Sequence, residues 1–332
     1  MEMETKELKL IKLNSSTMKK LALIFCLTIM TWSAFAQRDA LYSQFMFNRL
    51  IINPAYSGSR DALTMTLLNR YQWVGFGDGA PRTLTFSAHS PLRNEKIALG
   101  MYVYADQTGP FTDVGFMANY AFRIRIYNGI LALGLQAGFN QVNLDWTEFK
   151  ARNVDDPVLL QQPDNKLKPD ANFGVYYYTK SYYIGLSSKQ LFESQYGKVE
   201  GIEGVDTYGK LARHFYGIAG LALPFSDKVV FRPGFMFKYT DNAPLNFDVN
   251  ASFLFNDIVW LGASYRTNYN AITSRNALVF MVELNLTKNW RLGYSYDAYL
   301  SEIRLHNQGS HEVMISYETN IFKPRVLTPR YF

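Results

Sequence analysis

Several stretches of the sequence alternate apolar and polar residues over nine or more positions, and this pattern most constrains the fold. In the stretch ILALGLQAGFNQ (130–141), Leu133 and Leu135 fall on one face of an extended chain, whereas Gln136 and Asn140 fall on the other. Three further stretches show the same period: 114–126, 245–255 and 276–286. A period of two over this length predicts β-strands, each with one apolar face.

Strand length and loop length separate two all-β architectures that both alternate. Strands of soluble β-sandwiches commonly have about five or six residues, whereas the strands predicted here have about 9–13, the length of a tilted membrane-spanning strand. Connections after even-numbered strands are tight, as in Tyr127-Asn128-Gly129, and connections after odd-numbered strands are longer, above all 143–171 and 190–212. A sandwich has no reason to sort its loops in this way, but an outer-membrane barrel has short periplasmic turns and long external loops.

The sequence therefore predicts an all-β protein, a transmembrane outer-membrane β-barrel of about 14 antiparallel strands. Closure satisfies every backbone hydrogen bond inside the bilayer and leaves no open sheet edge. Some of the 23 tyrosines and of the tryptophans are expected to form girdles at the membrane interfaces, and the others to lie in the core. The strands are expected to begin near Ala62, Arg82, Lys96, Asp113, Ile130, Asn172, Tyr182, Arg213, Lys228, Leu245, Ile258, Asn276, Trp290 and His311.

The first 36 residues have the pattern of a cleaved secretory signal. MKKLALIFCLTIMTWSAFAQ contains two lysines, an apolar run over 21–30 and an Ala-x-Ala site at 34–36, which predicts cleavage before Gln37 and a possible start at Met18. The alternative, a membrane-anchoring helix, needs about 18 apolar residues or more, and this run is shorter. The single cysteine of the chain, Cys26, lies inside the predicted signal, so the mature chain would contain no thiol.

Residue patterns that carry catalytic or metal chemistry are missing from the sequence. The four histidines are scattered, and SHEVMISY (310–317) lacks the second histidine of a zinc-protease helix. The glycine-rich GFGDGAP (75–81) is followed by a strand, whereas a phosphate loop would lead into a helix. We therefore predict no enzymatic activity, no cofactor and no metal site. The formal net charge of +6 lies in no block, which argues against nucleic-acid binding.

Charged and amide residues on the polar faces of the strands are expected to face the lumen, where a barrel tolerates charge. The lumen-facing candidates are Arg123, Arg125, Asp248, Asn250 and Glu283.

The stretch before the first strand, NRLIINPAYSGSRD (48–61), is apolar but does not alternate. Exposed in the periplasm, this stretch would form an apolar patch prone to association. A barrel of about fourteen strands has a lumen that its own side chains do not fill completely, and the stretch could occupy that space. We therefore predict that residues 37–60 form a plug, with the barrel over 61–320 and a C-terminal tail over 321–332; the alternative is a disordered leader. The plug motif consists of Phe45, Phe47, Asn48, Asn53, Pro54, Ala55, Tyr56 and Gly58.

The same region carries a resemblance to a known family. DALYSQFMFNRLIINPAYSGSRD, followed by RYQWVGFGDGAPRTLTFSAHSPL, resembles the PorP/SprF family of the Bacteroidetes, and NFGVYYY, WLGASYR, LGYSYDAYL and GSHEVMISYE continue the match along the chain. The matching positions include Gln72, Trp73, Tyr296, Asp297, His311 and Glu312.

This resemblance implies a non-enzymatic outer-membrane component of the type IX secretion system, which helps secrete or tether a surface cargo such as a large adhesin in gliding species. Its implied partners are outer-membrane lipid, the C-terminal domain of a type IX cargo and a periplasmic, peptidoglycan-linked protein. Two alternatives stay open. The Asn-Pro-Ala sequence is also similar to the hatch of FadL-like channels, which implies transport of a small hydrophobic solute, and the third possibility is a soluble β-rich adhesin.

Overall fold

The computed structural model describes residues 40–93, 95–145, 166–198, 207–241, 243–268 and 276–320. The chain divides into two compact units, 1–36 and 37–332, and only the second contains described residues. The predicted signal peptide and the predicted tail over 321–332 lie outside these ranges. Within them, no helix has the length and the apolar character needed to cross a bilayer.

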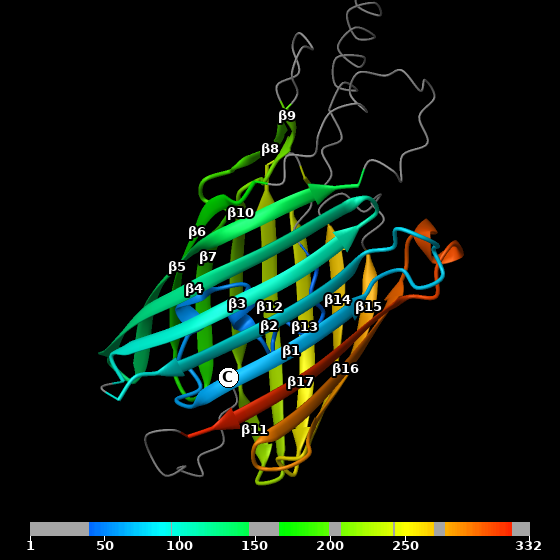
Figure 1. Cartoon of the computed structure of the whole chain (residues 1–332). Coiled ribbons are helices and arrows are strands. Elements are labelled where there is room, and N and C mark those ends of the chain that lie inside the picture. The colour runs from blue at the N-terminus through cyan, green and yellow to red at the C-terminus, as the bar shows by residue number, and fades with distance from the viewer. Residues whose placement is uncertain are drawn as a thin grey trace, which may run out of the picture. The chain divides into compact units, whose positions relative to one another are not determined.

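Fifteen strands of the described residues form one antiparallel sheet, and the sheet closes on itself. The first strand, β1 (Leu63–Tyr71), pairs with the last, β17 (Ser310–Thr319), over its whole length. β10 (His214–Leu221) and β11 (Leu223–Ser226) both pair with β12 (Val229–Thr240), so they are two parts of one wall strand interrupted at Ala222. The wall therefore has fourteen strands in sequence order, which confirms the predicted barrel (Figure 1).

Each predicted strand start lies within a few residues of an observed one; the largest difference is at β6, predicted from Asn172 and observed from Lys168. The remaining wall strands are β2 (Arg82–Pro91), β3 (Ile97–Thr108), β4 (Phe111–Ile126), β5 (Gly129–Leu144), β6 (Lys168–Tyr178), β7 (Tyr182–Lys189), β13 (Asn246–Phe255), β14 (Val259–Asn268), β15 (Ala277–Asn285) and β16 (Trp290–Tyr299).

The two faces of the wall differ in burial as the alternation predicts. Along β5, Leu135 and Phe139 on the outer face are each 52% exposed, whereas Gln136 and Asn140 on the inner face are almost fully buried. Not every aromatic residue faces outward, because Tyr176, Tyr183 and Trp260 are buried on the inner face. The outer face thus carries the apolar belt that a bilayer requires, and polar groups line the lumen.

The two ends of the barrel differ in the length of their connections. One end, here called the short-turn end, carries tight turns such as the residues between β4 and β5 and those between β13 and β14. In the second of these turns, residues 256–258, Asn256 and Asp257 have φ values of 50° and 56°, in the left-handed region that asparagine and aspartate tolerate. The opposite end, here called the long-loop end, carries the longer connections.

Two details of the connections differ from the prediction. The turn between β3 and β4 consists of Gly109 and Pro110 alone, so one connection after an odd-numbered strand is as tight as those at the short-turn end. The φ of 54° at Gly109 permits this turn, because glycine adopts the left-handed region without strain. The connection between β7 and β10 contains a hairpin that the alternation did not reveal, formed by β8 (Gln195–Lys198) and β9 (Thr207–Lys210).

Residues 40–60, called the N-terminal segment below, are not part of the wall. They contain two short 3-10 helices, η1 (Arg49–Ile51) and η2 (Pro54–Tyr56), and η2 contacts β4, β5 and β6. In Figure 1 this segment is the blue chain inside the ring of strands. Side chains from 42 to 58 are almost all buried against the inner face of the wall.

Candidate functional site: the N-terminal segment in the lumen

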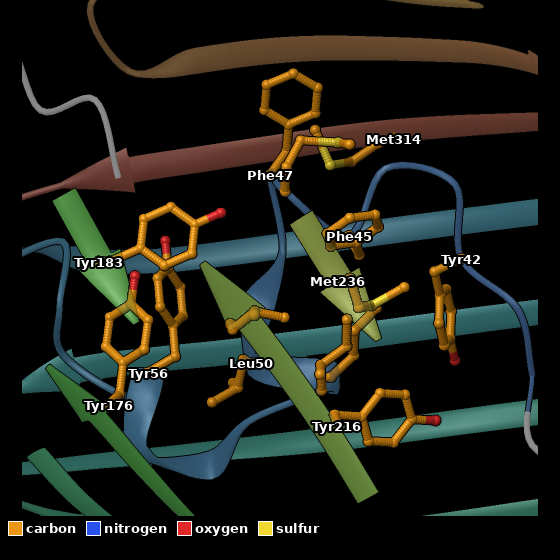
Figure 2. Packing of buried hydrophobic residues seen from close by; sticks show 14 of the residues in the cluster. Tyr42, Phe45, Phe47, Leu50, Tyr56, Tyr176, Tyr183, Tyr216, Met236 and Met314 are labelled. Atoms are coloured by element: carbon orange, nitrogen blue, oxygen red, sulfur yellow. The ribbon is translucent and has the colours of Figure 1, made fainter. Parts of the chain in front are cut away.

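The apolar side chains of the N-terminal segment and of the inner wall form one hydrophobic cluster. Phe45, Leu50 and Ile51 are each at most 2% exposed. Figure 2 shows Tyr56 of the segment beside Tyr176 and Tyr183 of the wall, with ring centroids of Tyr56 and Tyr176 5.6 Å apart. At about 25 cal/mol per Å² of buried apolar area, a cluster of this kind favours the seated segment strongly over an exposed one.

Three glycines of the inner wall form a cradle for residues 53–55. They are Gly134 on β5, Gly174 on β6 and Gly185 on β7. A Cβ atom at Gly134 would overlap the backbone of Ala55, and a Cβ at Gly174 would overlap the side chain of Asn53. The absence of side chains at these positions therefore lets the segment approach the backbone of the wall.

Asn53 supplies the polar contacts of this cradle. Its Oδ1 accepts a hydrogen bond from the backbone N–H of Ala55 (2.9 Å), which caps η2, and Pro54 occupies the first helical position, where no N–H is needed. Its Nδ2 donates to the backbone oxygens of Val175 (3.0 Å) and Leu186 (3.2 Å), which face each other on β6 and β7. One side chain thus shapes the segment and binds it to two strands.

A second anchor holds the start of the segment by charge. The backbone N–H groups of Ser43 and Gln44 donate to the two carboxylate oxygens of Glu312 (2.9 and 2.8 Å). The Ser43 hydroxyl donates to Asp297 (2.7 Å). Both carboxylates are fully buried, and backbone donors to a carboxylate give strong, directional hydrogen bonds.

Two buried arginines balance these carboxylates. Arg70 Nη2 lies 2.6 Å from Asp297 and its Nη1 lies 3.2 Å from Glu312. Arg266 bridges Asp297 (3.2 Å) and Asp248 (3.0 Å). We call these two arginines and three carboxylates the latch; they come from β1, β13, β14, β16 and β17.

The latch lies toward the long-loop end, because Arg70 is one residue from the end of β1 and Glu312 is near the start of β17. The cradle lies toward the short-turn end, because Gly134 and Gly185 are close to the starts of β5 and β7. The N-terminal segment therefore traverses the lumen, and Gly58, with a φ of 75°, leads it toward β1.

Further contacts fix the exit of the segment at the short-turn end. The backbone N–H of Gly58 donates to Nδ1 of His89 (3.0 Å). Arg60 pairs with Glu318 (2.9 Å), and Asp61 accepts a hydrogen bond from Arg123.

Buried cations also lie over aromatic rings along the segment. The guanidinium of Arg49 is 4.1 Å from the ring centroid of Tyr183. The guanidinium of Arg232 is 4.3 Å from the ring centroid of Trp260 and 5.0 Å from that of Phe47. Such contacts stabilise a cation more strongly where water is excluded.

The structure distributes the predicted lumen-facing residues as follows. Arg123, Asp248, Asn250 and Glu283 are buried on the inner face. The prediction is wrong for Arg125, whose side chain is 82% exposed and lies 3.4 Å from Glu95.

The physical reason is the length of β4. Pairing between β3 and β4 ends at Ile97 and Phe122, so the last residues of β4 project past the wall and pair with β5 alone. An alternating pattern assigns a face to each residue, but it does not show where a neighbouring strand ends.

The residues of the predicted plug motif are all buried: Phe45, Phe47, Asn48, Asn53, Pro54, Ala55, Tyr56 and Gly58. The motif dipeptides Tyr296-Asp297 and His311-Glu312 each place their first member on the outer face and their second in the latch. Gln72 and Trp73 begin the connection between β1 and β2, and the backbone N–H of Trp73 donates to the Ser310 hydroxyl (3.0 Å).

Sequence reasoning missed several residues that hold the segment: Arg60, Arg70, Arg266, Glu318 and the three cradle glycines. The alternation could have identified three of the charged residues as lumen-facing, because Arg70, Arg266 and Glu318 lie on the polar faces of alternating strands. Nothing in one sequence shows which of these charges meet. Within the described ranges, no group of three or more His, Cys, Asp or Glu side chains could hold a metal ion.

A closed antiparallel barrel with an apolar outer face and a polar inner face defines a membrane β-barrel of the outer-membrane class. Residues 34–317 match the family model described as Type IX secretion system membrane protein PorP/SprF. The chain therefore belongs to the PorP/SprF family of type IX secretion system membrane proteins.

The chain also has weaker likenesses to solved barrels. Against the CymD monoaromatic hydrocarbon channel it has 14% identity and a TM-score of 0.49, covering 87% of this chain and 95% of that one. Against a TodX deltaS2S3 mutant monoaromatic hydrocarbon channel it has 11% identity and a TM-score of 0.48, covering 85% and 95%. The outer membrane protein Omp33 of Acinetobacter baumannii gives 6% identity and a TM-score of 0.45, covering 78% and 99%. No curated protein matches the chain.

Proposed function

We propose that this protein is a non-enzymatic outer-membrane component of the type IX secretion system that helps to secrete or tether a surface cargo. On this proposal residues 1–36 are a cleaved export signal and the N-terminal segment is a permanent plug. The observation that supports it best is the anchoring of that segment at both ends of the lumen, by the latch and by the cradle. A barrel filled in this way acts through its surfaces.

We further propose that the short-turn end faces the periplasm and the long-loop end faces outward, as the loop lengths of outer-membrane barrels favour. The cargo C-terminal domain would then bind the external loops 143–171 and 190–212, of which 146–165 and 199–206 lie outside the described residues. The described part of the second loop includes the hairpin of β8 and β9, whose Tyr196 packs with Val142 and Leu211. A peptidoglycan-linked protein would contact the periplasmic side.

The test is cargo display in a strain that carries a barrel with residues 194–211 replaced by a short Gly-Ser linker. Because the wall strands on either side are untouched, the barrel should still insert, and the cargo should be lost from the cell surface. The control carries the same linker inserted at Asn128, in a short turn, and should display cargo normally. Normal display by the first variant would contradict cargo binding through this loop.

Transport of a small hydrophobic solute is the second candidate function. It is favoured by the apolar side chains on the inner wall around the segment, such as Met236, Val279 and Met281. A strain that lacks the protein would then lose uptake of an apolar solute while keeping its cargo, the opposite of the outcome expected for a secretion component.

A further inference from the structure

Four side chains on adjacent strands form a row on the outer face of the barrel. They are Tyr296 on β16, His311 on β17, Tyr71 on β1 and Arg82 on β2, and each is paired in register with the next. Their chain neighbours Asp297, Glu312, Arg70 and Thr83 are buried on the inner face. We call these four outward-facing side chains the outer row.

The outer row lies at the edge of the apolar belt. Tyr71 is the last residue of β1 and Arg82 the first residue of β2, so the row marks the long-loop end of the wall. Toward the short-turn end the outer face of the same strands is apolar and exposed, with Leu67 at 43%, Leu84 at 48% and Val313 at 47%. A row at this edge lies at the level of lipid headgroups, where amphipathic aromatic side chains are favoured.

The hydrogen bonds of the row leave some of its donors available on the outer face. Tyr294 and His311 Nδ1 are hydrogen-bonded (2.8 Å), and with the tyrosine as donor the other ring nitrogen, Nε2, carries the proton. Tyr71 Oη accepts from Asn69 (3.3 Å) and keeps its own hydroxyl proton to donate. The guanidinium of Arg82 lies 5.7 Å from the Tyr71 ring centroid and has no ion pair among the described residues.

The charge of this surface is one-sided. Every carboxylate of these four strands, namely Asp297, Glu312 and Glu318, faces inward. The outer face at the row therefore presents Arg82 and two neutral donors with no acidic side chain from β1, β2, β16 or β17. A planar guanidinium beside hydroxyl and imidazole donors is suited to a phosphate group.

We propose that the outer row is a binding site for the phosphate of a lipid headgroup in the leaflet at the long-loop end. The acyl chains of that lipid would cover the exposed leucine and valine side chains below the row, and its phosphate would accept hydrogen bonds from His311, Tyr71 and Arg82. The site lies on the opposite face of the wall from the latch, and the dipeptides 296–297 and 311–312 contribute to both.

The test is native mass spectrometry of the detergent-purified full chain, titrated with diphosphoryl lipid A, with the same lipid after dephosphorylation, and with inorganic phosphate. The double variant Arg82→Gln/His311→Gln should bind diphosphoryl lipid A about tenfold more weakly, as expected for the loss of charge-assisted hydrogen bonds. Removing the phosphates should weaken binding to the unmodified chain by a similar factor. Inorganic phosphate should not compete, since it lacks the acyl chains.

The matched control is Arg125→Gln, which removes one exposed arginine at the short-turn end and should leave lipid binding unchanged. Heat-modifiable migration on a gel reports whether each variant forms the barrel. If the double variant fails to fold, Arg82→Gln is compared with Arg82→Lys, which keeps the charge and should bind more tightly than the glutamine variant. Equal lipid affinity of the variants and the unmodified chain, or full competition by inorganic phosphate, would overturn the proposal.

Discussion

The two ends of the N-terminal segment are held by different interactions, one electrostatic and one steric. At the latch, Ser43 and Gln44 bind through hydrogen bonds to buried carboxylates that two arginines balance. At the cradle, residues 53–55 fit against three glycines, and a single neutral side chain, Asn53, makes the polar contacts. The latch depends on the balance of its charges, whereas the cradle depends on the absence of side chains at the three glycines, which makes room for the segment.

This difference predicts how substitutions at each end destabilise the protein. Removing one member of a buried ion pair leaves an uncompensated charge, which costs more than the pair itself contributes. Filling a cradle position adds volume where the packing has none to spare, so the segment or the wall must move. The variants below separate the two cases.

The largest effect is expected at the latch. Arg70→Met leaves Glu312 without its buried cation and should lower the free energy of unfolding by about 3–5 kcal/mol. Denaturant titration in lipid vesicles measures it. The matched control, Arg125→Met, removes an arginine whose side chain is 82% exposed, and its cost should stay below about 1 kcal/mol. Equal losses in both variants would show that the buried charges do not hold the segment.

A double variant sharpens this result. Arg70→Met combined with Glu312→Gln removes both charges of one pair, so it should cost less than the sum of the single changes. Additive costs would mean that Arg70 and Glu312 act independently.

The next largest effect is expected at the cradle. Gly134→Val suits a β-strand, but its side chain would overlap the backbone of Ala55, and we expect a cost of about 1–3 kcal/mol. A cysteine introduced at Ala55 reports the displacement as faster thiol labelling. Gly115→Val is the control, because the three atoms nearest to a Cβ there belong to the Tyr104 side chain of the wall and not to the N-terminal segment. Unchanged labelling in the Gly134 variant would contradict a tight fit.

The smallest effect is expected from Asn53. Asn53→Ala loses the cap of η2 and two hydrogen bonds to the wall, at a cost of about 1–2 kcal/mol. Asn53→Asp keeps the cap but sets a carboxylate oxygen against two backbone oxygens, so it should be less stable than the alanine variant. Unfolding titrations of the two variants compare them directly, and a more stable aspartate variant would argue against the observed orientation of the amide.

The wall was largely predictable from the sequence, because alternation is a local property of each strand. It assigned outward-facing residues such as Leu135 and Phe139 and inward-facing ones such as Asp248 correctly. It failed at Arg125, which is exposed because it lies beyond the end of the pairing between β3 and β4.

The two anchors were far less predictable, because each depends on closure. Arg70 and Glu312 are far apart in the sequence and meet because β1 pairs with β17. Gly134, Gly174 and Gly185 act together only through the register of β5, β6 and β7. Sequence reasoning singled out the segment as apolar and non-alternating and predicted a plug, but it could not name the residues of the wall that contact it.

The central claim is that the N-terminal segment fills the lumen, and planar-bilayer conductance tests it most directly. Deleting residues 41–56 removes the contacts at both anchors but leaves the pairing of the wall strands in place. About fourteen strands enclose a wider space than eight, so the deleted barrel should conduct ions whereas the intact protein stays closed. Equal, near-zero conductance in both would mean that something other than this segment closes the lumen.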